Sequence, residues 1–223
     1  MPRREYGQFC GLARAAEVVG QRWTLLIIRD LLVGPRRYSD LAAELPGIPS
    51  NVLATRLREL EDDGLVTREL LGGQRRSVVY RATPRAEELT PALDALGRWG
   101  AGAMREPRAG EVVTTAALVA GLRGAVAGGQ TPPKGLRRVF VVRSGEAAAC
   151  ATIDDGAVTV EAGERDDPDL VIVAGAGFRD LLAGVIEPDE AVATGAVTVS
   201  GDAALLAEFS SVFRVPYSES VAL

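Results

Sequence analysis

A stripe of leucines between Pro49 and Gly64 constrains the fold of this chain more than any other feature. Leu53, Leu57 and Leu60 recur at the spacing of one helix face, and such a stripe must be buried against other elements. The proline before it and the glycine after it favour a helix confined to this segment. The sequence therefore predicts a short amphipathic helix that packs into a small core.

The preceding segment, residues 37–47, is typical of another helix that ends in a tight turn. Ser39 is expected to cap its N-terminus, and Pro46-Gly47 stops it. Ser50 is expected to cap the leucine-bearing helix in the same way. Two short helices joined by a Pro-Gly turn are the arrangement of a helix-turn-helix motif.

The leucine-bearing helix also has a polar face, formed by Asn51, Ala54, Thr55 and Arg58. In the major groove of DNA, Asn pairs with adenine, Arg pairs with guanine, and small methyl groups pack on the thymine methyl. Ser50 lies at the helix N-terminus, where donors can meet a phosphate. Any amphipathic surface helix also has a polar outer face, so the helix alone leaves both interpretations open.

A β-hairpin is predicted directly after this helix. Two β-prone runs, residues 65–71 and 77–83, flank the segment GGQRR, in which two glycines favour a turn. Arg75 and Arg76 follow these glycines. An arginine-tipped hairpin after a candidate recognition helix is the layout of a winged helix, whose wing follows the sugar-phosphate backbone. A solvated tip can hold two arginines by chance, but helix, turn and hairpin in this order rarely arise so.

The hairpin is followed by a helix with Thr83 as its predicted N-cap and Pro84 at its first position. Pro91 is expected to kink this helix or to mark its true start. Two further helices are predicted before the helix-turn-helix, at residues 12–20 and 22–34.

Composition limits the functions that the chain can have. It contains no histidine and only two cysteines, which argues against imidazole-based catalysis, thiolate zinc sites and a disulfide framework. Residues 1–105 contain 16 arginines and 13 acidic residues, whereas residues 106–223 contain 9 basic and 17 acidic residues. No apolar run is long enough to span a membrane, and no secretory signal is evident, so a cytoplasmic location is expected.

The second half of the chain has a different pattern. After a linker at residues 105–111 and a helix at 112–129, four β-prone runs precede two short helices, a fifth strand and a last helix. This order favours an α+β domain with helices on one face of the sheet. The acidic segment 164–169 is typical of a solvated loop and predicts no metal site.

The first half resembles the HxlR family of bacterial winged-helix regulators, which are relatives of the MarR proteins. The resemblance covers residues 9–100 and is carried by GQRWTLLIIRDLL, LPGIPSNVLATRLRELEDDGLV and YRATPRAEEL. It implies a DNA-binding homodimer in which the terminal helices of this half pair across a two-fold axis. By position, the DNA-binding residues are then Ser50, Asn51, Ala54, Thr55, Arg56, Arg58, Arg75 and Arg76.

The second half, over residues 137–213, resembles the sterol-carrier-protein type-two fold through DLVIV, FRDLLAGVIEPDEAVATG and VTVSGD. The resemblance implies an apolar tunnel for lipid-like ligands. Its candidate lining residues are Phe140, Val142, Ile172, Phe178, Leu181, Leu182, Ile186, Leu206, Phe209 and Phe213. Such an apolar set is first of all what a domain core requires, and a pocket would need a volume of about 300 Å³ or more, so both interpretations stay open.

Two cysteines and two tryptophans need separate interpretations. Free cysteines are usually buried, so a structural position is expected for Cys10 and Cys150, although some HxlR relatives use a cysteine near the N-terminus as a redox switch. Trp23 and Trp99 are expected in the core or at a dimer interface.

These patterns together predict a mainly α, winged helix-turn-helix domain over residues 1–105 and an α+β, sterol-carrier-like domain over residues 106–223. The expected function is sequence-specific transcriptional regulation by a homodimeric repressor that binds double-stranded DNA and responds to a hydrophobic small-molecule effector. No enzymatic activity, metal, cofactor or membrane partner is expected. The alternative is a carrier of lipids or hydrophobic metabolites that uses its winged-helix half as an interaction platform.

Overall fold

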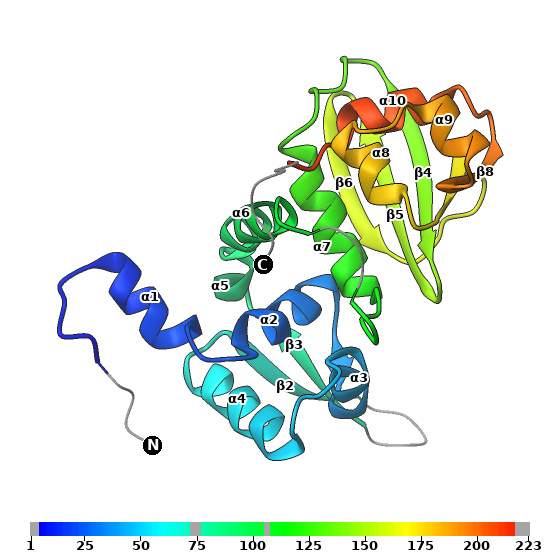
Figure 1. Ribbon diagram of the computed structural model, residues 1–223. Helices are drawn as coiled ribbons and strands as arrows, with labels where there is room; N and C mark the ends of the chain where they lie inside the picture. The colour runs from blue at the N-terminus through cyan, green and yellow to red at the C-terminus, as the bar shows by residue number, and fades with distance from the viewer. Residues whose placement is uncertain (1–4, 72–76, 105–107, 217–223) are drawn as a thin grey trace. The chain divides into compact units, whose positions relative to one another are not determined.

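The computed structural model describes residues 5–71, 77–104 and 108–216 of the chain (Figure 1). The chain divides into two compact units, Met1–Leu93 and Asp94–Leu223, and the division falls inside one helix, α6 (Thr90–Ala101). Each unit has its own sheet and its own buried core.

The first unit is a winged helix-turn-helix fold. Its elements follow the order α1 (Gly11–Val19), α2 (Thr24–Val33), β1 (Arg36–Arg37), α3 (Tyr38–Glu44), α4 (Ser50–Asp62), β2 (Val66–Leu71), β3 (Ser77–Ala82) and α5 (Pro84–Glu87). The three strands form a sheet of order β1-β3-β2, in which β2 and β3 are antiparallel. The predicted helices and hairpin are therefore confirmed, and the short strand β1 is an addition.

The leucine stripe of α4 is buried, as predicted. Leu53, Leu57 and Leu60 are at most 1% exposed and pack in a core with residues of α2 such as Ile27 and Ile28. Burying a leucine side chain is worth about 1.5–3 kcal/mol, so the stripe fixes which face of α4 points inward.

Two predicted helix caps are wrong by one or two residues. The Asp40 carboxylate accepts a hydrogen bond from the backbone N–H of Arg37 at 3.0 Å, so α3 begins at Tyr38 and Ser39 lies inside it. The Pro49 carbonyl accepts the first helical hydrogen bonds of α4, which makes Pro49 the N-cap and Ser50 the first helical residue.

The predictions for the segment after the hairpin hold. The Thr83 hydroxyl accepts a hydrogen bond from the Ala86 N–H at 3.4 Å, and Pro84 is the first residue of α5. The helical segment is then interrupted, and Pro91 is the second residue of α6. Pro91 thus marks a true helix start, which a proline tolerates because the first-turn N–H groups have no helical partner.

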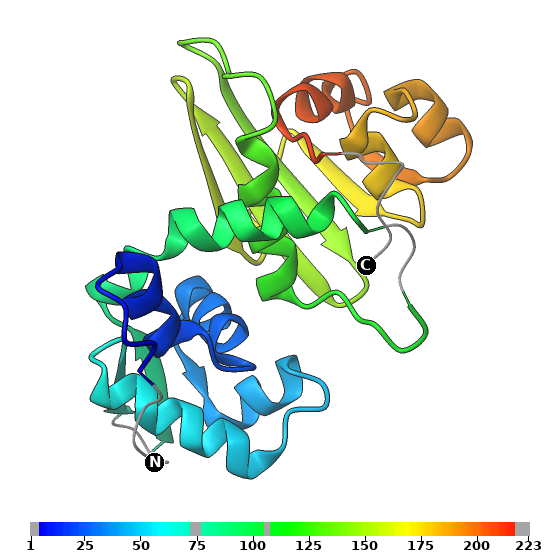
Figure 2. The same cartoon turned by 60° about the vertical axis from the view of Figure 1, so that its left-hand side comes forward.

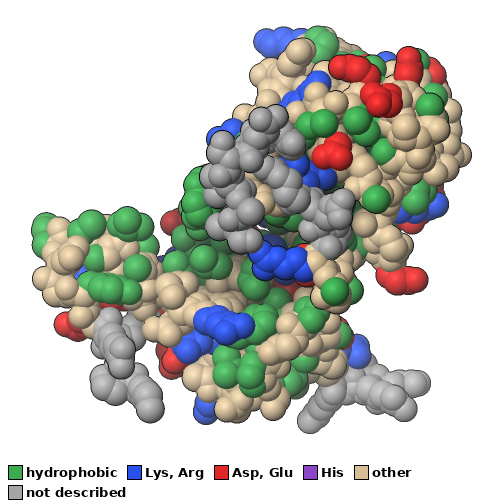
Figure 3. Space-filling view, in the orientation of Figure 1, with side chains coloured by type: hydrophobic (Ala, Val, Ile, Leu, Met, Phe, Trp, Pro, Cys, Tyr) green, Lys and Arg blue, Asp and Glu red, His purple; other side chains and the backbone are tan. Residues whose placement is uncertain are grey.

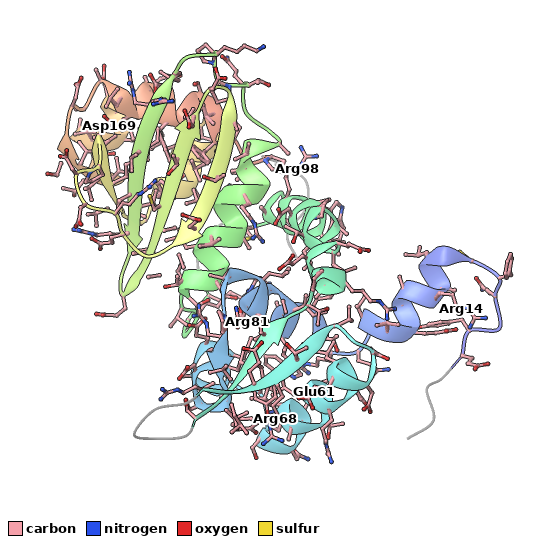
Figure 4. All side chains as sticks on the ribbon, turned by 180° about the vertical axis from the view of Figure 1, so that it is seen from behind. Arg14, Glu61, Arg68, Arg81, Arg98 and Asp169 are labelled. Atoms are coloured by element: carbon pink, nitrogen blue, oxygen red, sulfur yellow. The ribbon has the colours of Figure 1, made fainter. Side chains whose placement is uncertain are left out.

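The second unit contains a five-stranded mixed sheet. From α6, its elements are α7 (Thr115–Val126), β4 (Arg137–Ser144), β5 (Ala147–Asp154), β6 (Ala157–Ala162), β7 (Leu170–Ala174), α8 (Phe178–Ala183), α9 (Pro188–Ala193), β8 (Val197–Gly201) and α10 (Leu205–Val212). The strand order is β6-β5-β4-β7-β8, and only β4 and β7 are parallel. The Asp169 carboxylate accepts a hydrogen bond from the Val139 N–H at 2.7 Å and ties the start of β7 to β4 (Figure 4).

The helices α7, α8 and α10 lie on the same face of this sheet, as predicted (Figures 1 and 4). α6 crosses α7 (Figure 2), where the Arg123 guanidinium pairs with the Asp94 carboxylate at 3.2 Å. Gly124 allows this close approach, because a Cβ there would lie 3.2 Å from the Asp94 carbonyl oxygen. This unit is consistent with an α+β domain.

Candidate nucleic-acid interface

The turn between α3 and α4 places the candidate recognition helix. Gly47 has a φ of 82°, a backbone conformation that residues with a Cβ rarely adopt. The Tyr38 hydroxyl at the start of α3 donates a hydrogen bond to the Ser50 carbonyl at 2.7 Å. Helix α4 is therefore held at its N-terminal end by α3 and along its length by the buried leucines.

The polar strip of α4 points away from the leucine stripe. Asn51 and Arg58 are exposed, and Ala54 and Thr55 between them are half-buried. Ser50, at the N-terminal end of the helix, is exposed as well. The side chains that the sequence predicts to read bases thus share one accessible face. Arginine side chains are visible on the surface of the first unit (Figure 3).

Two members of the strip are hydrogen-bonded to the helix itself. The Thr55 hydroxyl donates to the Asn51 carbonyl at 2.8 Å, and the Arg58 Nε donates to the Ala54 carbonyl at 3.3 Å. The Arg58 bond uses one of the five N–H donors of the guanidinium, so the others remain for a base edge. Within the described part of the chain, the Asn51 side-chain amide has no hydrogen-bond partner, so both its donor and its acceptor face solvent.

Arg56 occupies another side of α4. Its guanidinium is paired with the Glu59 carboxylate, and its Nη2 lies 3.5 Å from the Gln21 side-chain oxygen. The side chain is 19% exposed. Arg56 therefore lies beside the strip, toward the corner between α1 and α2, rather than within it.

The hairpin contributes further cationic side chains. Arg68 on β2 and Arg81 on β3 are both exposed (Figure 4), and Arg81 pairs with Glu69 at 3.4 Å. The predicted wing residues Arg75 and Arg76 lie outside the residues that the structure describes.

The comparisons with known proteins agree with this geometry. Residues 18–107 match the HxlR-like helix-turn-helix family. The chain is 38% identical over 91 residues to the HTH-type transcriptional regulator YkvN of Bacillus subtilis, which is 41% of this chain and 77% of that protein. The chain belongs to the HxlR family. It is a DNA-binding transcriptional regulator of the HxlR and MarR type.

Two further relatives of this HxlR protein are similar to it in sequence over about the same fraction of the chain. The Bacillus subtilis regulator YvaP is 34% identical over 39% of this chain and 80% of its own length. A crystal structure of a MarR-family transcriptional regulator from Enterococcus faecalis is 37% identical over 40% of this chain and 81% of its own length, with a TM-score of 0.37. The family match ends at residue 107, before the sheet of the second unit begins.

The second candidate site, in the second unit, is a packed cluster. Eight of the ten predicted lining residues are buried, and Phe178 and Ile186 are half-buried. Phe209 is central to it: its ring centroid lies 4.5 Å from that of Phe213 and 5.3 Å from that of Phe140. The structure therefore brings these residues together as a core.

The two cysteines differ in environment. Cys10 is exposed at the N-cap of α1, so the expectation of a buried position is wrong for it. The backbone N–H groups of Ala13 and Leu12, in the first turn of α1, lower the pKa of the Cys10 thiol. Cys150 is 4% exposed, as expected, and desolvation raises the pKa of its thiol.

Several exposed apolar side chains were not evident from the sequence. The N-terminal segment and α1 expose the large apolar side chains of Tyr6, Phe9 and Leu12, and α6 exposes those of Leu96 and Trp99. Trp99 is 74% exposed, so the prediction of a core position is wrong for it, and a dimer interface stays a prediction. The described residues contain neither a helix suited to crossing a membrane nor a group of three or more potential metal ligands.

Proposed function

We propose that the protein is a homodimeric repressor that reads an inverted repeat in double-stranded DNA through α4. The exposed strip Asn51, Ala54, Thr55 and Arg58, opposite a fully buried leucine stripe, is the observation that supports this proposal. Its side chains match the donors, acceptors and methyl groups of base edges. Ser50 and Arg56 would contact phosphates. In a two-fold dimer the two half-sites lie about one helical turn apart.

The dimer would form through the N-terminal segment with α1 and through α6. These elements expose Phe9 at 106%, Leu12 at 79% and Trp99 at 74%, and a second copy would cover them. Replacing Trp99 by Ser should shift the protein from dimer to monomer in analytical ultracentrifugation. A wild-type protein that sediments as a monomer at micromolar concentration would contradict this part of the proposal.

Repression would result from occupancy of the operator, because a dimer bound across two half-sites prevents other proteins from binding the same DNA. The protein would act in the cytoplasm, on operators near the genes that it controls. A reporter gene placed behind a selected operator should be expressed less when the protein is present. Higher expression would identify an activator instead.

The second part of the proposal concerns residues 106–223, which we propose form a sterol-carrier-like domain that binds a hydrophobic effector. The five-stranded mixed sheet with helices on one face and the cluster around Phe209 support it. An effector can change DNA affinity only by binding the DNA-competent and incompetent dimers unequally, and a coupling of about 1–3 kcal/mol is ordinary.

The decisive experiment is selection of bound fragments from random duplex DNA by the purified full chain. A recurring inverted repeat is expected. Asn51→Ala and Arg58→Ala should each cost about 1–3 kcal/mol on the selected sequence and relax base preference. Arg137→Ala, which removes an exposed arginine of the second unit, is the control and should change nothing.

Changing Arg75 and Arg76 together to Ala should weaken binding to all duplexes and reduce the salt dependence of binding, because these arginines would contact phosphates or enter the minor groove. If the selection recovers no preferred sequence, or if the α4 variants bind the selected fragment as wild type does, the proposed function is wrong. Recovery of an apolar ligand with the protein, without selective DNA binding, would identify a carrier.

A further inference from the structure

A cavity of about 350 Å³ lies beside the recognition helix, within the first unit. One wall is the corner between α1 and α2, formed by Gln21, Arg22 and Trp23. The rest of the lining consists of Gly47 and Pro49 from the helix-turn-helix turn and of Val52 and Arg56 from α4. The cavity therefore joins two segments that are separated by more than twenty residues in the sequence.

The cavity borders the base-reading strip. Successive residues of an α-helix are rotated by about 100°, so Val52 and Arg56 lie roughly 100–140° around the helix axis from Asn51. The leucine stripe occupies the next sector of the helix surface and is buried. A duplex that places base edges against Asn51 thus brings one of its two backbones toward the side of α4 that Arg56 occupies.

The lining of the cavity is cationic. Arg22 and Arg56 are its two charged residues, and no carboxylate lines it. The Arg22 guanidinium lies 5.3 Å from the centre of the Trp23 ring, so the aromatic face supports it without neutralising it. Arg56 is paired with Glu59, and its Nη2 lies 3.5 Å from the Gln21 side-chain oxygen. A guanidinium has five N–H donors, so Arg56 keeps donors beyond these two contacts, and the exposed Arg22 offers its own to the same anion.

The backbone at this corner is held in an uncommon conformation. Trp23 has a φ of 78°, a left-handed backbone conformation that is rare for a bulky residue. Trp23 also packs against the buried core of the first unit, so the surrounding structure supports this conformation. This corner places Arg22 along the same cavity as Arg56.

We infer that this cavity is a clamp for one phosphate of the DNA backbone, held by Arg22 and Arg56 together, with Gln21 beside them. Guanidinium groups are the preferred partners of phosphate oxygens, to which they donate two parallel hydrogen bonds. Phosphate contacts on the flank of a recognition helix fix its register in the groove. The inference rests on the proposed DNA binding, which it extends to a positioning contact from outside the helix-turn-helix.

The test uses the full chain and a fragment recovered by selection, in which single phosphates are replaced in turn by neutral methylphosphonates. For the wild-type protein, replacement at the clamped position of each half-site should weaken binding by about tenfold. The Arg22→Ala variant should bind the unmodified fragment about tenfold more weakly than the wild type does. It should bind the fragment modified at the clamped position no more weakly than it binds the unmodified fragment, because the contact is already lost.

Three further measurements separate the clamp from other roles of Arg22. Arg22→Ala should lower affinity for selected and unrelated duplexes alike and should reduce the slope of log K against log salt by about 1. Asn51→Ala should instead keep the penalty at the clamped phosphate. Arg137→Ala, with the same change of charge, should behave as wild type in each assay, and thermal melting should be unchanged in Arg22→Ala.

The clamp is wrong if the wild-type protein binds its selected fragment but Arg22→Ala retains every methylphosphonate penalty and the full salt slope. A loss of affinity in Arg22→Ala that inorganic phosphate at millimolar concentration reproduces in the wild type, without any position-specific penalty, would assign the cavity to a free anion and would also overturn the inference. Failure of the wild-type protein to select DNA would instead refute the proposed function.

Discussion

In the first unit the candidate site is polar and the core is apolar, whereas in the second unit both are apolar. This difference determines which of the two candidate sites can be identified from the sequence. In the first unit, α4 buries Leu53, Leu57 and Leu60 and exposes Asn51 and Arg58. Because the core face and the reading face differ in chemistry, either one identifies the other. In the second unit, the residues proposed to line a ligand site and the residues that form the core have the same chemistry.

The structure sharpens this contrast. The candidate ligand residues around Phe209 lie in ring-to-ring contact. A hydrophobic effector that binds between these rings would have to separate them. Such binding would disrupt part of the packing of the second unit, whereas the polar strip of α4 in the first unit is already exposed.

Replacing Phe209 by Ala is the largest perturbation that the comparison predicts. Phe209 is fully buried among Phe140, Phe178 and Phe213, so its removal leaves a cavity and should lower the free energy of unfolding of the second unit by about 3–5 kcal/mol. Chemical denaturation followed by circular dichroism would measure this loss. Val173→Ala on the sheet, at a side chain that is 42% exposed, is the control and should cost less than about 1 kcal/mol.

The opposite result would change the interpretation of the second unit. If Phe209→Ala costs less than about 1 kcal/mol, the rings line a space that is already open, and the sterol-carrier-like tunnel gains support. If the loss of stability is large and the variant binds an apolar dye that the wild type does not bind, the cavity is created by the substitution, and in the wild type these residues form a packed core.

Much of this architecture could be predicted from the sequence because local rules determine it. The buried stripe on α4, the Thr83 cap and the start of α6 near Pro91 all follow from residues within about one helical turn. The caps at Ser39 and Ser50 were wrong because neighbouring groups, the Asp40 carboxylate and the Pro49 carbonyl, satisfy the first N–H groups of those helices instead.

The remaining features depend on contacts that sequence spacing does not show. The cavity between Arg22 and Arg56 requires the corner of α1 and α2 to approach α4, and its strained Trp23 has no sequence signal. Exposure of Trp99 was equally undetermined, because the same residue type suits a core and an interface. A hydrophobic residue type thus predicts burial well, but it does not predict the function of a buried or exposed group of apolar residues.

A buried carboxylate in the first unit gives the second-largest expected effect. Asp30 on α2 is inaccessible to solvent, and desolvation raises its pKa from 3.8 to about 6, although Arg29, at 2.7 Å, opposes the shift. The folded state then holds the proton to a higher pH than the unfolded state does. Stability from this group is therefore fully present below about pH 4 and is lost as the pH rises through 6.

This loss should amount to roughly 2–3 kcal/mol for a shift of that direction and size. Urea denaturation of the wild type and of Asp30→Asn at pH 4, 5, 6 and 7 would measure it as the pH-dependent difference between the two proteins. Asp62→Asn, which changes an exposed carboxylate at the end of α4, is the control for a general effect of charge. If the free energy of unfolding changes with pH in the same way in the wild type and in Asp30→Asn, the prediction is wrong, and any pH dependence comes from another group.

The two thiols provide the smallest and most direct comparison between the units. Cys10 is exposed, and its thiol pKa is lowered by backbone donors, whereas Cys150 is 4% exposed and its thiol pKa is raised by desolvation. Because the thiolate is the reactive species, native Cys10 should be alkylated by iodoacetamide at neutral pH at least about tenfold faster than Cys150. Mass spectrometry of peptides from the native protein would follow both rates, with the urea-unfolded chain as the reference in which the rates converge. Equal rates in the native protein would show that β5 opens on the timescale of the reaction, and the second unit would then be the more mobile of the two.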